Sequence, residues 1–334
     1  MTRQVDLARR LNVSQGTVSR VLGGQPGISQ KIRRKILAAA RAAGYRKRQA
    51  RTPRPQTLIA RATGVICADI PRHDEWQARL LDGIIAAARE TGHEVIVSAH
   101  ANEDLPRVVS RGQVDGLVRL MCQDDYERTH LTAAPVPTVS ILFPVPGADV
   151  ASVDHFGSAR ELGLHLGALR PGIAAYVGHA YPIGQARFAG VRSGLEQWGA
   201  KVPPELVRMS YALDADKVMP LVGELLDLRA AGRPEHQFTL IAFYNDHLAR
   251  HAARYIRERG LRVPEDIGVA GYDDLGLPVA RDLRLTTVHL PLEELGAEAV
   301  RRVHWRLRNP GAPPIHWLLP TRLVEGGSVL RRDA

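Results

Sequence analysis

The spacing of apolar residues predicts three short helices in the first 45 residues. Apolar positions recur every three or four residues, and Thr2, Ser14 and Ser29 are placed to cap the three helices. The positions expected to face inward are Val5, Leu7, Ala8 and Leu11, then Val18, Val21 and Leu22, then Ile32, Ile36, Leu37 and Ala40. Asn12 tolerates left-handed backbone angles and suits a tight turn after the first helix. Two short helices joined by a tight turn, with a third behind them, form a helix-turn-helix unit.

A different pattern begins after Gly64, where apolar runs alternate with helical stretches. The runs are GVICADI, HEVIVSAH, VDGLVRLM, VPTVSILF, IAAYVG, FTLIAFY and IGVAGYDD. This alternation predicts parallel sheets in α/β subdomains, which bind ligands beyond the carboxyl ends of their strands. Polar residues close four of these runs, and we therefore expect a binding cleft lined by Asp69, Arg119, Asp246 and Asp273.

The net charge of +10 is concentrated in the first 55 residues. This stretch holds eleven Arg, three Lys and a single acid, Asp6, so it carries +13 and leaves −3 for the rest of the chain. A basic excess that overlies a helical pattern favours a domain that binds a polyanion over a solvated basic tail.

The second predicted helix presents a small polar face opposite its apolar positions. This face carries Gln15, Gly16, Ser19 and Arg20. In the major groove Gln can pair with adenine and Arg with guanine, and each pair discriminates by about 1–3 kcal/mol. Gly16 costs about 1 kcal/mol of helix propensity relative to Ala. Either the helix backbone approaches DNA closely there, or a short, packed helix tolerates the glycine.

Several segments of this region resemble the DNA-binding module of LacI/GalR-family transcription regulators. They are VDLA (5–8), VS (13–14), TVSRVL (17–22), Ser29, Arg33 and GY (44–45). The resemblance implies a lambda-repressor-like domain whose DNA contacts come from Ser14, Gln15, Gly16, Thr17, Ser19, Arg20, Ser29, Arg33 and Tyr45. The alternative, a three-helix module that binds another protein, is disfavoured by the charge.

Residues 46–63, RKRQARTPRPQTLIARAT, are basic and contain two prolines, as expected of a linker between domains. The family usually places a hinge helix here whose Leu wedges into the minor groove, but Pro53 stands at that position. Proline disfavours helix at the preceding residue, although it can itself act as a wedge, and a shifted register would offer Leu58. We expect a linker that is irregular without DNA and contacts the minor groove through Arg51 or Arg54.

From residue 64 onward the chain resembles the effector domain of the same family, which is related to periplasmic sugar-binding proteins. Matching segments include VDGL (114–117), ND (245–246), VPEDI (263–267), GYDD (271–274) and TTV (286–288). The resemblance implies an α/β effector-binding and dimerisation domain at 64–334, after a helix-turn-helix domain at 1–45 and a linker at 46–63. Its two subdomains would comprise about 64–153 with 289–319, and about 154–288 with 320–334.

The predicted effector site carries polar and aromatic side chains, of which Arg187, Asp246 and Asp273 fall where the family holds the hydroxyls or polar ring atoms of its effector. The full set is Asp69, Trp76, Arg119, Asp154, Phe156, Arg187, Asn245, Asp246 and Asp273. A guanidinium supplies several donors and carboxylates accept paired hydroxyls, although Arg187, Asp246 and Asp273 could instead form a structural ion-pair network. Trp76 either stacks on the ligand or anchors its helix, and Arg119 either reaches the cleft or pairs with a carboxylate.

Two departures from the family pattern leave the effector open. His155 stands where the family often has Asn, and a charged loop occupies residues 71–75. A sugar or sugar derivative is the family's commonest ligand. A nucleoside is an alternative, and so is a small acid if Arg119 lines the cleft.

No catalytic or metal-binding motif appears, and we expect neither a cofactor nor enzymatic activity. His247 and His251 lie four residues apart on a helix that also carries arginines, which indicates a solvated face rather than a ligand pair. No phosphate-binding loop or nucleophile elbow occurs. Without a secretion signal or a long apolar run, we expect a cytoplasmic protein. Cys67 and Cys122 would then be reduced, with a disulfide as the alternative.

These patterns predict a homodimeric regulator, most simply a repressor, that binds a near-palindromic operator under the control of a small-molecule effector. The alternative is a solute-binding protein of a transport system. Such a protein would share the two-lobed fold, but it would carry a signal peptide and no basic three-helix head.

The linker hypothesis can be tested by removing its cations. Arg51→Ala and Arg54→Ala are each expected to weaken operator binding and to lower its salt dependence by about one unit of slope, because each removes a phosphate or groove contact. DNA titrations at several salt concentrations measure both quantities. Unchanged affinity and slope in both variants would contradict a contact between the linker and DNA.

Overall fold

The computed structural model describes residues 4–22, 29–43, 62–67, 75–99, 109, 111–120, 136–145, 147–212, 214–276, 278–279 and 283–331. The chain separates into two compact units, Met1–Leu58 and Ile59–Ala334. This division falls inside the segment predicted to be a linker. Each unit is described by itself.

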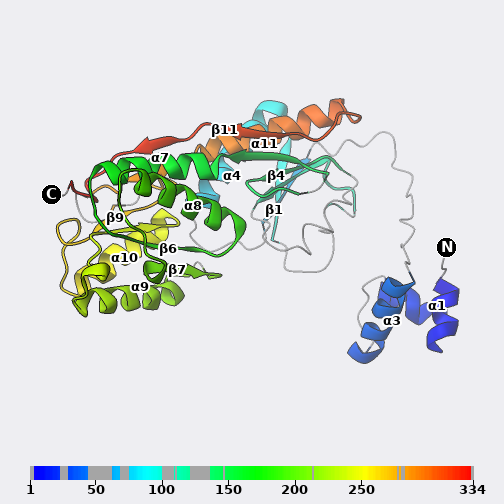
Figure 1. The fold of residues 1–334 in the computed structure, drawn as a ribbon. Coiled ribbons are helices and arrows are strands. Elements are labelled where there is room, and N and C mark those ends of the chain that lie inside the picture. The colour runs from blue at the N-terminus through cyan, green and yellow to red at the C-terminus, as the bar shows by residue number, and fades with distance from the viewer. Residues whose placement is uncertain are drawn as a thin grey trace. The chain divides into compact units, whose positions relative to one another are not determined.

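The first unit contains three helices, α1 (Gln4–Leu11), α2 (Gln15–Leu22) and α3 (Gln30–Ala42), drawn in blue in Figure 1. The predicted inward face is confirmed by a buried core of Leu7, Ala8, Val18, Val21, Ile36 and Ala40, with Leu11, Leu22 and Leu37 packed against it. The prediction is wrong at Ile32, which is 38% exposed. The core that α3 shares with α1 and α2 lies at its later turns, around Ile36 and Ala40. Thr2 and the side chain of Val5 lie outside the described residues.

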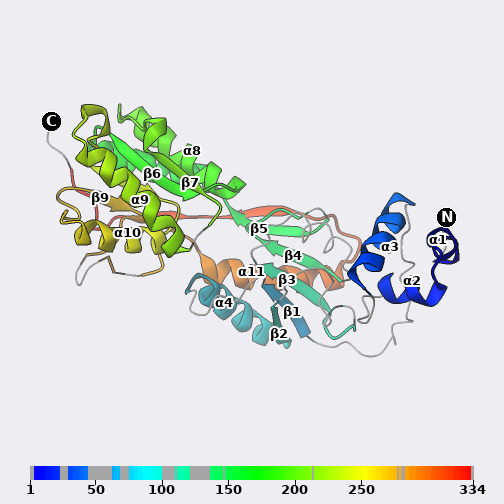
Figure 2. The same cartoon turned by 90° about the horizontal axis from the view of Figure 1, so that it is seen from below.

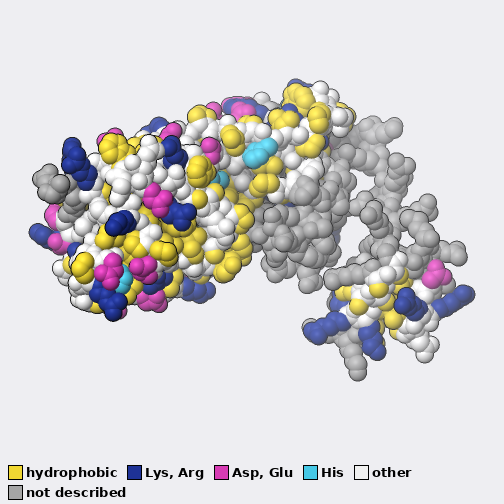
Figure 3. Space-filling view, in the orientation of Figure 1, with side chains coloured by type: hydrophobic (Ala, Val, Ile, Leu, Met, Phe, Trp, Pro, Cys, Tyr) yellow, Lys and Arg dark blue, Asp and Glu magenta, His cyan; other side chains and the backbone are white. Residues whose placement is uncertain are grey.

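The turn between α1 and α2 has the predicted chemistry. Asn12 adopts a left-handed φ of 52°. Ser14 caps α2, since its Oγ accepts a hydrogen bond from the N–H of Thr17 at 3.0 Å. Basic side chains are exposed on this unit, at Arg9, Arg10, Arg34 and Lys35, and Figure 3 shows dark-blue side chains around its described surface.

The second unit begins with a parallel sheet in the order β11-β5-β4-β3-β1-β2, which forms the first lobe. Its strands are β1 (Ala62–Cys67), β2 (Glu94–Ala99), β3 (Gly116–Leu120), β4 (Thr138–Ile141), β5 (Asp149–Val153) and β11 (His316–Leu319). Helices α4 (Glu75–Thr91) and α11 (Leu292–Arg308) pack against each other beside this sheet, as Figure 2 shows.

The second lobe is built on a parallel sheet in the order β7-β6-β8-β9. Its strands are β6 (Ala174–His179), β7 (Val207–Ser210), β8 (Leu240–Phe243) and β9 (Gly268–Ala270). Its helices are α7 (His155–Ala168), α8 (Pro182–Gln197), η1 (Pro204–Leu206), α9 (Ala215–Ala230), η2 (Pro234–His236) and α10 (Asp246–Glu258). Each of the seven apolar runs overlaps a strand, which confirms the predicted parallel α/β architecture.

The chain passes between the two lobes at three places. β5 leads directly into α7, β10 (Thr287–His289) leads into α11, and β11 leads into β12 (Arg322–Val324). β10 and β12 pair antiparallel. Isolated bridges join Ala270 to Thr286 and Asp273 to His289, so the loop after β9 lies beside the second crossing.

Two glycines bring α4 and α11 into close contact. A Cβ atom on Gly83 would lie 1.8 Å from the carbonyl oxygen of Glu293, and one on Gly296 would lie 2.2 Å from that of Leu80. No larger residue fits at either position without moving a helix, so backbone packs directly on backbone. In the described ranges, no helix is long and apolar enough to cross a membrane.

Candidate functional site

A buried ion pair stands at the carboxyl ends of the strands in the second lobe. Nη2 of Arg187, on α8, lies 3.2 Å from Oδ1 of Asp273, and both side chains are almost fully buried. Nη1 donates to the carbonyl oxygen of Tyr244 at 2.8 Å. The guanidinium lies 3.8 Å from the ring centre of Tyr272 and 4.6 Å from that of Tyr244. Burial, the largest single influence, lowers the pKa of Arg187, but the Asp273 carboxylate together with the neighbouring tyrosines raises this pKa overall.

Asp273 has a backbone conformation that few residues adopt. Its φ is 113° and that of Asp274 is 55°, both in the region that favours glycine. The N–H of Asp273 donates to the carbonyl oxygen of Val288 at 2.8 Å, which holds the loop against β10. Strained backbone of this kind persists only where its surroundings enforce it, and it is concentrated at functional sites.

Asp246, the first residue of α10, uses both carboxyl oxygens within the protein. Oδ1 accepts a hydrogen bond from Thr287 Oγ1 at 2.6 Å, and Oδ2 accepts one from the N–H of Leu275 at 2.9 Å. Burial, helped by the nearby charge of Asp273, raises the pKa of Asp246 to about 8, so the group is mostly neutral at pH 7. Its contacts tie β10 and the loop after β9 to α10. Direct contact of Asp246 with an effector stays a prediction.

Aromatic rings continue from the ion pair to the surface. The His179 ring lies 5.3 Å from that of Tyr244 and 4.8 Å from that of Tyr181, which in turn lies 5.3 Å from Tyr211. Tyr211 is 74% exposed. The four rings follow the carboxyl ends of β6, β7 and β8. Sequence reasoning missed them, because Tyr244 has the apolar pattern of the buried strand that it follows, and the contacts of the other three rings join separate segments.

A polar contact links the two lobes beside Asp273. Arg79 of α4 forms a bidentate pair with Glu293 at 2.6 and 2.9 Å, and its Nη1 donates to the carbonyl oxygen of Asp274 at 2.8 Å. The Asp274 carboxylate lies 2.9 Å from Nδ1 of His289 and 3.8 Å from Arg322. Asp274 therefore contacts both a helix of the first lobe and the crossing strands β10 and β12.

The structure brings some predicted effector-site residues together and separates others. Arg187, Asp246 and Asp273 meet as described, while Asn245 and Asp154 cap α10 and α7 by accepting hydrogen bonds from the N–H groups of Leu248 and Gly157. The remaining residues are Trp76, 9% exposed at the start of α4; Arg119, 2% exposed within β3; and Phe156, 45% exposed on α7. The burial of Trp76 in the core favours the anchoring role. Asp69 lies outside the described residues.

The predicted DNA-contact residues gather around α2. Ser14, Gln15 and Gly16 are exposed, and Thr17 is half-buried. On α3, Arg33 is half-buried, and Ser29 is exposed just before that helix. The side chains of Ser19 and Arg20, and all of Tyr45, Arg51 and Arg54, lie outside the described residues. A Cβ atom on Gly16 would meet only Ser14 Oγ, at an ordinary 3.7 Å, so packing within the unit does not require a glycine there.

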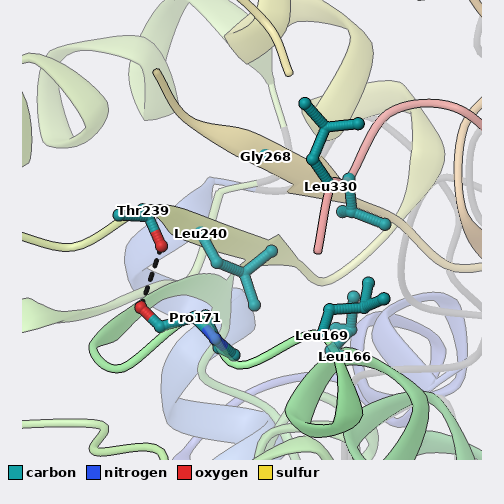
Figure 4. Close-up of a pocket in the computed structure, with 8 residues that line it drawn as sticks. Leu166, Leu169, Pro171, Thr239, Leu240, Gly268 and Leu330 are labelled. Atoms are coloured by element: carbon teal, nitrogen blue, oxygen red, sulfur yellow. Dashed lines mark hydrogen bonds between the residues drawn. The ribbon is translucent and has the colours of Figure 1, made fainter. Parts of the chain in front are cut away.

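A small apolar pocket lies at the opposite end of the second sheet from the ion pair. It is a shallow, partly open depression, and its lining comprises Leu166, Leu169, Pro171, Thr239, Leu240, Gly268, Val329 and Leu330 (Figure 4). Thr239 Oγ1 donates to the Pro171 carbonyl oxygen there at 2.8 Å. None of the predicted effector-site residues lines it. Among the described residues, no group of three His, Cys, Asp or Glu side chains could hold a metal ion.

Comparison with known proteins agrees with this organisation. Residues 5–47 match the family model of bacterial regulatory proteins of the lacI family, and residues 165–329 match a periplasmic binding protein-like domain. The HTH-type transcriptional regulator MalR of Streptomyces coelicolor is 28% identical over 346 residues, which cover 98% of this chain and 96% of the relative.

Two solved structures share the fold across nearly the whole chain. A complex of the transcriptional regulator CelR with cellobiose has a TM-score of 0.70 at 24% identity, covering 98% of this chain and 100% of that one. The lac repressor dimer bound to operator and the anti-inducer ONPF has a TM-score of 0.64 at 23% identity, covering 98% and 99%.

The fold and the two domain matches define a helix-turn-helix transcriptional regulator with a periplasmic-binding-protein-like domain. Residues 5–47 carry the DNA-binding domain of the lacI family of bacterial regulatory proteins, and the relatives that match the chain along nearly its whole length are HTH-type transcriptional regulators. The alternative of a transport-linked solute-binding protein is not favoured, because the match at residues 5–47 is to a DNA-binding family.

The pKa of Asp246 predicts a specific pH dependence of stability. Because this pKa is near 8 in the folded protein and ordinarily 3.8, the unfolded chain binds fewer protons between these values. Asp246 therefore makes the protein less stable as pH rises from about 4 to 8. Asp246→Asn keeps an acceptor for the N–H of Leu275, and its amide NH2 can donate to Thr287 Oγ1, which then accepts instead of donating. The stability of this variant relative to the natural protein should rise with pH by up to about 1.4 kcal/mol per unit. Denaturant unfolding at pH 5, 6.5 and 8 measures the difference, and a constant difference would show an ordinary carboxylate.

Proposed function

We propose that this protein represses transcription by binding a near-palindromic operator as a homodimer, and that a neutral sugar bound at the second lobe controls its affinity for DNA. The lacI-family match at residues 5–47, the exposed basic side chains of the first unit and the operator-bound lac repressor dimer of the same fold support the DNA-binding part. A dimer with two-fold symmetry reads two half-sites related by the same symmetry.

The proposed DNA surface is the exposed face of α2 with its flanking residues. It comprises Ser14, Gln15, Gly16, Thr17, Ser19, Arg20, Ser29, Arg33, Tyr45, Arg51 and Arg54. Gln15 and Arg20 would read base edges, while the basic flank would contact phosphates and make binding strongly salt-dependent. The domain division proposed with it is 1–45 for the DNA-binding domain, 46–63 for the linker and 64–334 for the effector domain.

The observation that carries the effector proposal is the Arg187–Asp273 pair. Its two charges cancel, Asp246 is mostly neutral at pH 7, and the pKa of His155 is lowered to about 2 by burial and by Arg187, so that imidazole is neutral too. A site without net charge suits a polyhydroxylated ligand, whose hydroxyls donate to Asp273 and accept from Arg187. Arg119 belongs to β3 of the first lobe, whereas the pair stands in the second lobe, which gives a small acid less support. The exposed ring of Tyr211 offers a face for the apolar side of a sugar.

The proposed control of DNA binding acts through the loop of Asp273 and Asp274. A ligand that takes hydrogen bonds from Arg187 or gives them to Asp273 changes the contacts that hold this loop. The next residue, Asp274, contacts Arg79 of the first lobe and the crossing strands, so the change reaches the angle between the lobes. Coupling of this kind is typically about 1–3 kcal/mol, or 5–150-fold in DNA affinity.

We also propose that the protein works in the cytoplasm, where its DNA target lies, and that it catalyses no reaction. The match to a family of transcriptional regulators supports both statements.

Gly16→Ala tests the DNA-contact surface. The added methyl group fits the folded unit, and Ala favours helix, so α2 should become more stable by up to about 1 kcal/mol. If the α2 backbone approaches DNA closely, affinity for an inverted-repeat duplex selected from random sequences should fall about tenfold. Amide exchange in α2 and DNA titration measure the two effects, and Gly311→Ala in the second unit is the control. Equal affinity of Gly16→Ala and the natural protein would remove the contact at this position. Failure to select any inverted repeat would refute the DNA-binding proposal as a whole.

Asp273→Asn tests the effector site. The amide keeps the shape of the carboxylate and tolerates the left-handed backbone, but it removes a charge-assisted hydrogen bond worth about 1.5–3 kcal/mol. We expect sugar affinity to fall about 10- to 100-fold. Calorimetry on hits from a thermal-shift screen of sugars and nucleosides measures it, with Asp266→Asn, a surface partner of Arg262, as control. A ligand that binds Asp273→Asn with unchanged affinity would have its site elsewhere. If only nucleosides bind, a nucleoside effector would replace the sugar in the proposal.

A further inference from the structure

His155 occupies a buried position beside the Arg187–Asp273 pair. It is the first residue of α7, directly after β5, where the chain first crosses between the lobes. His155 is only 9% exposed, and the centre of its ring lies 6.4 Å from the centre of the Tyr272 ring. Tyr272 is also the ring over which the Arg187 guanidinium lies, at 3.8 Å. The imidazole and the guanidinium therefore share one neighbour.

Neither nitrogen of the His155 ring has a hydrogen-bond partner among the described residues, and both are buried. Two further buried polar atoms also lack a hydrogen-bond partner among the described residues. They are Nε of Arg187 and the hydroxyl oxygen of Tyr176. Buried polar atoms normally find partners, because leaving them unpaired costs free energy. These unpaired atoms share one neighbour, the guanidinium of Arg187, and ligand hydroxyl groups placed among them would satisfy them.

The ring of His155 is neutral, which determines what it can bond to. Burial and the nearby guanidinium of Arg187 lower its pKa to about 2. A neutral imidazole has one N–H donor and one acceptor nitrogen. An alcohol hydroxyl also donates and accepts, so a polyol can satisfy both nitrogens at once. A carboxylate ligand that carries no hydroxyl group offers only acceptors and would leave one nitrogen unpaired.

We propose that His155 is a specificity-determining residue of the effector site, where its imidazole hydrogen-bonds hydroxyl groups of a neutral sugar held by Arg187 and Asp273. The inference rests on the proposed function. Because α7 begins at a crossing, a change in the angle between the lobes moves its first turn and gives the ligand access to the ring. In the unliganded conformation the unpaired nitrogens disfavour the folded state, and a bound hydroxyl removes that cost.

This role and a structural role predict opposite effects of an apolar substitution. His155→Phe removes the two unpaired nitrogens and keeps an aromatic ring. The unliganded protein should therefore unfold about 2–4 °C higher, while sugar affinity falls at least about tenfold. His155→Met, which adapts its shape more freely, should shift both quantities in the same directions if the larger ring of Phe strains the core. His155→Asn, which keeps a donor and an acceptor, should retain more sugar affinity than either.

The experiment uses the full chain with ribose, glucose, maltose and cellobiose as probes, measured by thermal unfolding without sugar and by calorimetry with sugar. His165→Phe is the matched control, since His165 lies on the same helix and faces Glu325 at 3.7 Å, away from the pair. Lower stability of both His155→Phe and His155→Met without sugar would mean that His155 is a structural residue and would overturn the inference. Unchanged affinity of His155→Phe for a sugar that binds the natural protein would also overturn the inference, and the proposed function would then stand. If none of the four sugars binds the natural protein, the sugar proposal fails together with the inference.

Discussion

The buried charge of Arg187 is the constraint on which the second lobe depends. A guanidinium that is removed from water must be paired and hydrogen-bonded, and breaking such a pair by removing one partner typically costs about 3–5 kcal/mol. Its partners come from the ends of two different strands, Tyr244 after β8 and Asp273 after β9. One side chain of α8 thereby determines where two loops lie, and these loops form the edge at which parallel α/β sheets bind ligands.

The acids around this pair have different roles because their surroundings differ. Asp273 forms the ion pair with the guanidinium of Arg187. Asp246 is mostly neutral at pH 7, because it is buried close to the Asp273 charge, and it acts as a brace between α10, β10 and the loop after β9. Asp274 turns toward His289 and Arg322 on the crossing strands. Three neighbouring carboxyl groups thus provide the partner of a buried cation, a brace and a link between lobes.

Much of the fold could be predicted from local patterns, and less of the site. Helical spacing found the three helices of the first unit, and apolar runs found most of the parallel strands, because both patterns are set by neighbours in the chain. The error at Ile32 arose because burial depends on what covers a helix, which spacing does not encode. The GYDD segment indicated Asp273, but its left-handed backbone and the neutral state of Asp246 follow from contacts between distant segments. For the same reason the linking role of Arg79 could not be predicted.

The glycine contacts between α4 and α11 have a mechanical consequence. Because Gly83 and Gly296 leave no side chain between the helices, neither can slide along the other without a collision between main-chain atoms. Arg79 of α4 is also paired with Glu293 of α11, so a displacement of the Asp274 carbonyl that Arg79 binds would act on both helices together. The packing of α4 on α11 is set by this main-chain contact, so substitutions on the outer surface of the two helices should leave their joint movement unchanged.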